Sequence, residues 1–401
     1  DSAYLSRTQT SGSTTKFTYS AWMKRSKLGS AQDFLDVYDD NNNRFGFFWS
    51  DDDQIDMYNK ISGSVNFQKI TTAKYRDTSA WYNVIIAADT TLATAEDRIK
   101  LWVNGVRVTS FGTNTNPGSS DNLSIHSSDD TQRIGSYGTG GSDYDGYMAE
   151  VVWIDGTTYD NTYFGEFDSD SPKIWKPKDV SGLTFGNNGF HLDFEDSSAL
   201  GNDVSGENHD FSVTNLASTD QATDTCTNNF ATMNPLFARS NNVTFTEGNL
   251  KGALASEGNQ IIASTIAVSA GKWFFEFQAN AQEVSAYMEV GIFPTYHTTV
   301  TPNYIGGLSD GYSLQKNGYF YNNNSAVATD GPTYGTSDIM GVALDLDSGT
   351  KTIKYYKNGS LDDGTTQNIT VTEDVYIGWR GFGNAEALSM NFGSPKDSIS
   401  S

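Results

Sequence analysis

The chain has 401 residues, of which 49 are acidic and 26 are basic, giving a net charge of −23. A nucleic-acid binder needs clustered basic side chains, and an anionic membrane repels such a charge, so the composition argues against both partners. Only 37% of the residues are hydrophobic, but 13% are aromatic and 38 are glycines. Because aromatic residues favour strands and glycines favour tight turns, we expect an all-β protein. The length fits two antiparallel β-sandwich (jelly-roll) domains joined by an irregular connector.

The first expected domain spans residues 1–195. Its strand-like runs are Phe17–Lys24, Phe45–Trp49, Trp81–Ala87, Arg98–Val103, Tyr147–Ile154 and Phe190–Glu195. In the fourth run Ile99, Leu101 and Val103 share one face, which is the pattern of a half-buried strand. Asn104-Gly105 follows that run. This pair between two strands predicts a hairpin with a type I′ turn.

The second expected domain spans residues 245–393. Its strand-like runs include Lys272–Phe277, Gly341–Asp347 and Thr352–Lys357. Residues 196–244 lack a sustained periodicity and are rich in Asn, Asp, Ser and Thr, which predicts an irregular connector between the domains. Residues 394–401 are expected to form a linker or tail. We expect no helix longer than one or two turns anywhere in the chain.

Two sets of motifs resemble known domain families. The first domain resembles the concanavalin A-like, laminin-G-type lectin domains in FTYSAWMKRSKLG (17–29), WYNVIIAADTT (81–91), IKLWVNGVRV (99–108) and DGYMAEVVWIDG (145–156). The second domain resembles SPRY domains in EGNLK (247–251), SAGKWFFEF (269–277), IMGVALDLDSGT (339–350), YYKNG (355–359) and MNFG (390–393). The resemblance implies two consecutive sandwiches of the binding kind.

The segments around the connector resemble structural proteins of marine bacteriophages. They are FGEFDSD (164–170), IWKPK (174–178), GFHLDFEDSSALGNDVSG (189–206) and NNFATMNPL (228–236). In such phage proteins a lectin-like domain, this connector and a SPRY domain occur in one chain. The resemblance implies a part of a virion: a fibre, an appendage or a head decoration.

Retaining glucanases share the concanavalin A-like fold, and their reaction needs two carboxylates close together on one strand face. The nearest match is His191, Asp193 and Glu195, expected on one face of a strand, but its first position is a His. Glu150 and Asp155 are five residues apart, so a regular strand would place them on opposite faces. We therefore predict no catalytic residues.

The sequence gives little support for a zinc site or for a reactive cysteine. The four histidines, at positions 126, 191, 209 and 297, lack the spacing of zinc ligands. Cys226 stands between two threonines without a neighbouring His, which predicts an incidental thiol. Oxygen-rich loops would suit a structural calcium, but we assign no ligands and no cofactor. These loops contain Asp39-Asp40, Asp51–Asp53, Asp129-Asp130, and Asp143 with Asp145.

The candidate ligand-binding residues lie in the second domain. SPRY domains bind through loops at one edge of the sandwich, and an aromatic side chain on such a loop offers a flat face to a sugar or a peptide. The residues expected there are Phe293, Tyr296, His297, Tyr304, Tyr321, Trp379 and Arg380. The alternative is that most of these side chains pack on the core or on a neighbouring subunit.

These observations predict a non-enzymatic virion structural protein, assembled in the host cytoplasm and carried on the extracellular particle. Its expected partners are other virion proteins, host-surface glycans and copies of itself in a symmetric assembly. A bacterial surface or secreted adhesin is the first alternative. A polysaccharide-cleaving enzyme is the second, and it predicts that Glu195→Gln abolishes the release of reducing sugar.

Overall fold

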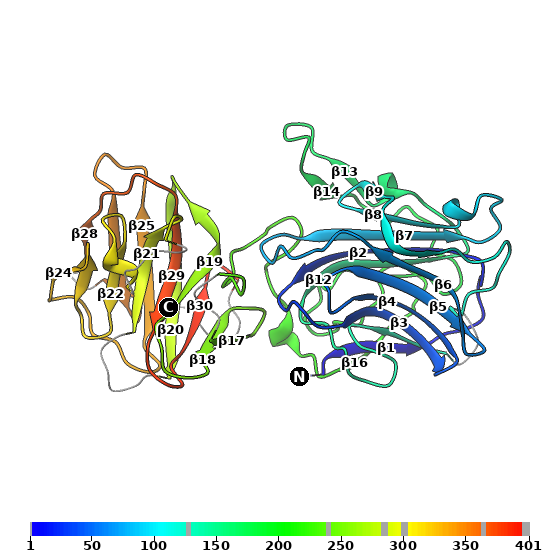
Figure 1. Cartoon of the computed structure of the whole chain (residues 1–401), viewed down its shortest axis with the longest axis horizontal. Helices are drawn as coiled ribbons and strands as arrows, with labels where there is room; N and C mark the ends of the chain where they lie inside the picture. Colours follow the sequence, from blue (N-terminus) through cyan, green and yellow to red (C-terminus); the bar gives the residue numbers. More distant parts are fainter. Residues whose placement is uncertain are drawn as a thin grey trace. The chain divides into compact units, whose positions relative to one another are not determined.

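The computed structural model describes residues 2–125, 130–237, 242–281, 288–297, 304–361 and 366–394. The chain folds into two compact units, Asp1–Asn229 and Phe230–Ser401 (Figure 1). Both units are built from antiparallel sheets, so the predicted all-β fold class is confirmed. The helical segments of the described residues are single 3₁₀ turns: η1 (Ala95–Asp97), η2 (Asn161–Tyr163), η3 (Ser218–Asp220) and η4 (Ile305–Gly307). None of the described helices is long and apolar enough to cross a membrane.

The first unit contains an eight-stranded sheet, called sheet I below. Its strands, in spatial order, are β10 (Phe111–Thr115), β6 (Ser64–Thr71), β5 (Ile55–Ile61), β4 (Asn43–Trp49), β3 (Gln32–Asp40), β11 (Thr131–Ile134), β1 (Tyr4–Thr8) and β16 (Ser212–Thr214). Figure 1 shows β3, β4 and β5 as one layer of this unit.

A six-stranded sheet, called sheet II, forms the other layer. Its strands, in spatial order, are β15 (Phe190–Leu192), β12 (Gly146–Asp155), β2 (Lys16–Arg25), β7 (Tyr82–Asp89), β8 (Ile99–Val103) and β9 (Val106–Val108). A separate hairpin consists of β13 (Gly165–Phe167) and β14 (Trp175–Pro177). The predicted strand runs therefore lie where β2, β4, β7, β8, β12 and β15 form.

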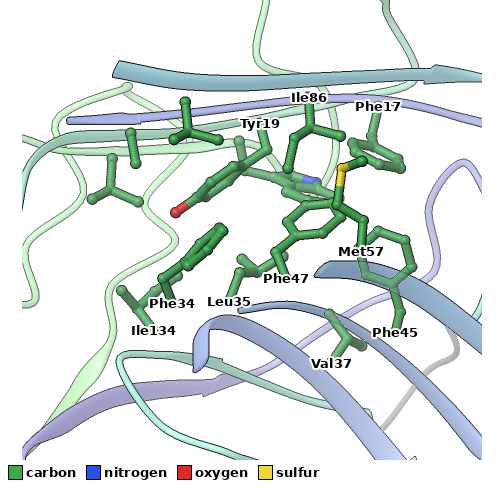
Figure 2. Packing of buried hydrophobic residues seen from close by; sticks show 14 of the residues in the cluster. Phe17, Tyr19, Phe34, Leu35, Val37, Phe45, Phe47, Met57, Ile86 and Ile134 are labelled. Carbon is green, nitrogen blue, oxygen red and sulfur yellow. The ribbon is translucent and has the colours of Figure 1, made fainter. Parts of the chain in front are cut away.

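Aromatic side chains fill the space between sheets I and II. Figure 2 shows Phe17 and Tyr19 of β2 facing Phe45 and Phe47 of β4. The Phe17 ring also stacks on Trp153, with the ring centroids 4.6 Å apart. Large rings bury a large area per residue, which explains how a chain of modest hydrophobic content closes this core.

Strands β2 and β7 of sheet II are buried on both faces. Their outward side chains lie under residues 156–189, where Ile85, Val152 and Phe185 form a second cluster. A third cluster on the same face contains Trp22, Trp81 and Trp175, with Cys226 packed against it. Segments outside the two sheets therefore cover the middle of sheet II, whereas Val106 of the edge strand β9 is 62% exposed.

The predicted hairpin at Asn104-Gly105 is confirmed. Val103 pairs with Val106, and both turn residues have positive φ, 48° for Asn104 and 76° for Gly105, as a type I′ turn requires. A Cβ at Gly105 would also lie 2.3 Å from the Trp175 ring, so glycine is needed there for space as well. The β8–β9 hairpin thereby allows Trp175 of β14 to pack against sheet II.

The run Phe190–Glu195 is shorter than expected. β15 ends at Leu192, because Phe194 adopts a left-handed conformation with φ 61°. The expectation that His191, Asp193 and Glu195 share one strand face is therefore wrong. β12 is also not regular: it contains a bulge between Ala149 and Val152.

The expected connector, residues 196–244, is divided between the two units. β16 pairs with β1 in sheet I, and Phe211 packs in the first core. Met233 instead packs in the core of the second unit, and β17 (Val243–Thr246) belongs to a sheet of that unit. The segment has no periodicity, but a few apolar side chains determine which unit each part of it packs in.

The second unit also consists of two facing sheets. Sheet III contains β17, β18 (Lys251–Leu254), β30 (Ala387–Asn391), β20 (Lys272–Ala281), β25 (Ile339–Asp345), β26 (Thr352–Lys357) and β27 (Ser360–Leu361), with β28 (Gln367–Asn368) also paired to β26. Sheet IV contains β19 (Gln260–Val268), β29 (Val375–Gly381), β21 (Glu289–Pro294), β22 (Tyr312–Gln315), β23 (Phe320–Asn322) and β24 (Ser325–Ala328). Phe277, Val342 and Trp379 lie in the core between them.

Candidate functional site

Four of the seven predicted ligand-binding residues lie on strands rather than on loops. Phe293 is on β21, Tyr321 is on β23, and Trp379 and Arg380 are consecutive on β29. Phe293 and Trp379 are fully buried, Phe293 against Phe237 and Trp379 in the core of the second unit. The loop placement of these four residues is therefore wrong, because the hydrophobic pattern around them belongs to sheet IV.

Arg380 is buried in a polar cluster on the outward face of sheet IV. Consecutive strand residues point to opposite faces, so Arg380 points away from the core that holds Trp379. Its guanidinium lies 3.5 Å from the carboxylate of Glu289 and 4.6 Å from the centre of the Tyr304 ring. Burial raises the pKa of Glu289, although Arg380 opposes that rise. Glu289 also accepts hydrogen bonds from the Ser313 hydroxyl and the Ile305 amide.

The remaining predicted residues differ in how much of each side chain is exposed to solvent. His297 is fully buried and packs edge-on against Phe293, with the ring centroids 5.5 Å apart. Tyr304 and Tyr321 are half-buried, whereas Tyr296 is 47% exposed. In this unit a surface ligand could reach Tyr296, Tyr304 and Tyr321, and binding through them stays a prediction.

Two side chains from the glucanase comparison pair with each other. The Glu150 carboxylate lies 2.7 Å from Nε2 of His191, whereas Asp155 accepts hydrogen bonds from the Ser13 and Asn188 amides. Glu150 sits in the bulge of β12 with φ 51°, which sequence spacing does not reveal. Burial and the nearby Glu150 charge raise the pKa of the Cys226 thiol to about 12, so this thiol is a poor nucleophile.

The acidic loops do not converge on a cation site within the described residues. There, no group of three or more His, Cys, Asp or Glu side chains is arranged to hold a metal ion. Asp53, from one of these loops, instead accepts a hydrogen bond from Arg76 at 2.7 Å and pairs with Arg25 at 3.1 Å. His126 and Asp129 lie outside the described residues.

The outer face of sheet I carries a set of side chains that sequence reasoning missed. Because Leu35, Phe47 and Met57 point into the core, the alternate residues of β3, β4 and β5 point outward. One row of directly paired outward residues crosses six of the eight strands of the sheet. From β6 to β1, this row consists of Gln68, Tyr58, Gly46, Asp36, Arg133 and Ser6.

Aromatic rings and guanidinium groups pack together around this row. The Arg44 guanidinium lies 4.9 Å from the Tyr58 ring centre and 3.8 Å from that of Tyr137. Phe48 packs edge-on against Tyr58, and Tyr38 packs edge-on against Tyr137. Farther along, Arg133 lies 4.4 Å from the Tyr4 ring centre. We call this set the tyrosine–arginine band: Phe48, Tyr58, Arg44, Tyr137, Tyr38, Arg133 and Tyr4.

Buried carboxylates lie beneath the band and position Arg44. Arg44 donates from Nε to Asp36 at 2.6 Å and from Nη2 to Asp33 at 2.8 Å. Burial, and then the neighbouring Asp36 charge, raise the pKa of Asp33 to about 8, although Arg44 opposes this rise. Burial also raises the pKa values of Asp36 and Asp56 to about 6. A salt-bridged and stacked guanidinium is a rigid surface, which favours binding because little side-chain freedom is lost.

Two glycines give the band its close packing. A Cβ at Gly46 would lie 3.1 Å from Asp36 Oδ2 and 3.3 Å from the Tyr58 ring. A Cβ at Gly138 would lie 2.2 Å from Cβ of Tyr38, and the Gly138 amide donates to Asp36 at 3.2 Å. The absence of a side chain at Gly138 allows the loop that carries Tyr137 to approach β3, and its absence at Gly46 leaves room for Asp36 and Tyr58.

The raised pKa of Asp33 predicts how the stability of the first unit depends on pH. Below about pH 4 the carboxyl is protonated in both the folded and unfolded states, so it contributes no pH dependence. Between about pH 4 and pH 8 only the folded state keeps the proton, so stability falls as pH rises, by at most about 1.4 kcal/mol per pH unit. Asp33→Asn cannot ionise and is expected to flatten the decline between pH 6 and pH 8.

Urea unfolding at several pH values, followed by hydrogen-exchange mass spectrometry of first-unit peptides, measures this decline. The control is Asp52→Asn, because Asp52 lies on the surface and pairs with exposed Lys74. An unchanged slope in Asp33→Asn would contradict the assignment of a buried, proton-holding carboxyl.

Comparisons with known proteins agree with the two units. Residues 1–159 match the family model described as the Concanavalin A-like lectin/glucanases superfamily, and residues 272–395 match that of the SPRY domain. Both are typically binding or interaction modules. No curated protein is similar enough to this chain to count as a match.

Solved structures similar to this chain include SPRY domains and a pentraxin. The SPRY domain of human HERC1 is 16% identical, with a TM-score of 0.34 over 40% of this chain and 98% of that chain. A human SPRY domain is 16% identical, with a TM-score of 0.31 over 38% of this chain and 97% of that chain. A heptameric SAP-like pentraxin from Limulus polyphemus is 17% identical, with a TM-score of 0.29 over 38% and 69%.

Proposed function

We propose that this chain, which carries a concanavalin A-like domain followed by a SPRY domain, is a non-enzymatic protein that binds surface glycans through the tyrosine–arginine band. The observation that carries the proposal is the band itself. Rings and guanidinium groups lie on one outer sheet face with carboxylates and the Gln68 amide beside them. Sugars present apolar C–H faces and hydroxyl groups together, and rigid aromatic rings with a few fixed polar groups suit both.

The pairing of several acidic side chains supports the proposed non-enzymatic role. A retaining glycosidase needs two carboxyl groups facing one sugar bond, one of them a nucleophile. Asp36 and Asp33 are both bonded to Arg44, Asp56 accepts from Gln68, and Glu150 is paired with His191. Each of these acidic groups is paired with another side chain of the protein, which supports binding without cleavage.

The place of this binding activity is proposed to be a virion, with other virion proteins as partners. The segments 164–170, 174–178, 189–206 and 228–236, which resemble phage structural proteins, support this proposal. Immunogold labelling of purified particles is expected to place the chain on them. Labelling confined to the cytosol of infected cells would contradict the virion role. Labelling of a bacterial envelope would instead favour the adhesin alternative.

The glycan-binding proposal predicts the effect of removing one ring from the band. Tyr137→Ala takes away the ring closest to Arg44, and we expect the affinity for glycans selected on a broad array to fall about tenfold. Isothermal titration calorimetry measures the loss. The matched control is Tyr163→Ala, since Tyr163 is 45% exposed but lies in η2, on a different element of the same unit.

Two results would contradict the proposal. One is the absence of any bound glycan on the array. The other is an equal loss of affinity in Tyr137→Ala and in the Tyr163→Ala control. Unchanged far-ultraviolet circular dichroism spectra are required of both variants, so that the comparison reports binding rather than folding.

A further inference from the structure

A buried lysine of sheet II contacts both an aspartate and an asparagine. Lys24 is on β2, and its ammonium group donates to Asp224 Oδ2 at 2.6 Å and to Asn229 Oδ1 at 2.8 Å. The Lys24 side chain is only 1% exposed. Its ammonium lies 5.7 Å from the centre of the Tyr147 ring, and the Trp81 ring nitrogen donates to Asp224. An amine, a carboxylate and a side-chain amide therefore meet beside aromatic rings.

A tight turn brings the aspartate and the asparagine to the lysine. Thr225 and Asn228 form an antiparallel bridge, in which the backbone amide of each residue donates to the carbonyl of the other. Asp224 and Asn229 are the next residues on either side of this bridge, so their side chains lie on the same face of the turn. The Asn229 side-chain nitrogen also donates to the Ser79 carbonyl at 2.8 Å, which keeps the amide oxygen directed at the lysine.

The arrangement suits the formation of an amide bond between the lysine and the asparagine. A lysine amine attacks a carbonyl carbon only as the neutral base. Burial lowers the pKa of Lys24, although the neighbouring Asp224 charge opposes this, and the Asp224 carboxylate is placed to accept the ammonium proton. The two reacting groups are already in contact, which replaces a bimolecular encounter with a unimolecular step. Asn229 is exposed, so the leaving nitrogen has a route to solvent.

We infer that Lys24 and Asn229 join in an amide cross-link, with Asp224 as the group that moves the protons. Asp224 takes a proton from the ammonium, and the amine nitrogen then attacks Cγ of Asn229. The new bond from Nζ to Cγ forms as the bond from Cγ to Nδ2 breaks. In total the lysine gives up two protons, which Asp224 passes to the leaving nitrogen, and this nitrogen departs as an ammonium ion. The reaction needs no oxidant, reductant or other reactant.

The cross-link ties the end of the first unit to a central strand of sheet II. β2 lies between β12 and β7, and Asn229 is the last residue before the second unit. The bond joins positions 205 residues apart, and closing so long a loop strongly restricts the unfolded chain. A force that enters at Phe230 would pass covalently into β2 rather than through the hydrogen bonds of β16. This inference does not depend on the proposed glycan binding.

Intact-mass spectrometry of the purified whole chain tests the inference. The chain is expected to weigh about 17 Da less than its sequence, which is the mass of ammonia. Proteolysis is expected to release one branched peptide that contains both Lys24 and Asn229. The full sequence mass would overturn the inference. A loss of about 18 Da, with Lys24 joined to Asp224 and water released, would overturn it too.

Variants at these positions identify the role of each group. Asn229→Ala and Lys24→Arg lack a reacting group and are expected to keep their full sequence mass. The matched control is Asn228→Ala, at the neighbouring exposed asparagine, which is expected to retain the loss of about 17 Da. Asn229→Ala also keeps the Lys24–Asp224 ion pair without the bond, so the contribution of that pair to stability is measured in this background.

The role of Asp224 is tested by the rate of the reaction. In aliquots taken after cell-free synthesis, Asp224→Asn is expected to form the cross-link about a hundredfold more slowly than the parent chain, because it cannot accept a proton. An unchanged rate would overturn the assignment of Asp224. Unchanged circular dichroism spectra are required, so that a slow reaction is not the result of misfolding.

The position of the mass loss is as important as its size. An Asn-Gly pair also loses ammonia when it cyclises to a succinimide, and the chain contains Asn104-Gly105 and Asn358-Gly359. A loss that maps to either pair, and that persists in Asn229→Ala, would overturn the inference. The proposed function fails separately, since a chain that binds no glycan can still carry the cross-link.

Discussion

Replacing Asp224 with alanine is expected to lower the free energy of unfolding of the first unit by about 3–5 kcal/mol. Asp224 lies 2.6 Å from the Lys24 ammonium and accepts a hydrogen bond from Trp81 at 2.9 Å. Both charged side chains are only 1% exposed. Removing one member leaves a buried ammonium without its closest counter-charge, and such losses are among the largest that a single substitution causes.

The pH dependence and a second variant identify the cause. Burial lowers the pKa of Lys24, so at high pH the ammonium loses its proton and the penalty in Asp224→Ala should shrink. The double variant Lys24→Met with Asp224→Ala should recover much of the loss, because no charge remains buried. Urea unfolding followed by exchange of first-unit peptides measures both. A double variant as unstable as Asp224→Ala would rule out the buried charge as the cause.

Arg380→Met is expected to destabilise the second unit by a similar amount, about 3–5 kcal/mol near neutral pH. The carboxylate of Glu289 is fully buried, and Arg380 is its pairing partner across β21 and β29. Because burial raises the pKa of Glu289, the carboxyl takes up a proton as pH falls, and the penalty should diminish in acid.

Two further variants test this explanation. Glu289→Gln combined with Arg380→Met should be more stable than Arg380→Met alone, since no buried charge is left. Lys272→Met, which removes a surface ion pair with Asp345, should change stability little. The pairing would be refuted by an Arg380→Met variant whose loss of stability, read from second-unit peptides, is the same at every pH.

Sequence patterns predicted the fold class and six of the sixteen described strands of the first unit, because alternation and turn residues act locally. Arg98–Val103 and Asn104-Gly105 are examples, since both the strand and the turn depend on neighbouring residues alone. The length of β15 was not predictable in this way. Its end depends on the left-handed conformation of Phe194, which tertiary packing imposes on a residue that does not favour it.

The candidate site was harder to predict than the fold. The outward positions of β4 and β5 hold Phe48 and Tyr58, where an exposed face would normally hold polar residues. This excess of aromatic residues was the available signal. Their assembly with Tyr137 and Tyr4 depends on the order of five strands and on the loop at Gly138. Such long-range pairing is not encoded in local periodicity.

Four of the residues predicted as ligand-binding were wrongly expected on loops. An aromatic residue next to an Arg, as in Trp379-Arg380, is typical of exposed binding loops, but it also fits a strand with one core face and one polar face. Burial decides between these two interpretations. Trp379 is fully buried in the core, whereas Arg380 lies beneath Tyr304 as a buried support.

The most direct test of the central claim is hydrogen exchange of the intact protein with and without its best array glycan. If the tyrosine–arginine band is the binding site, protection should appear in β3, β4, β5 and the segment 135–141 that carries Tyr137. The strands of sheet II and the second unit should exchange at unchanged rates. Protection confined to the second unit, or to β8 and β9 at the edge of sheet II, would contradict the assignment.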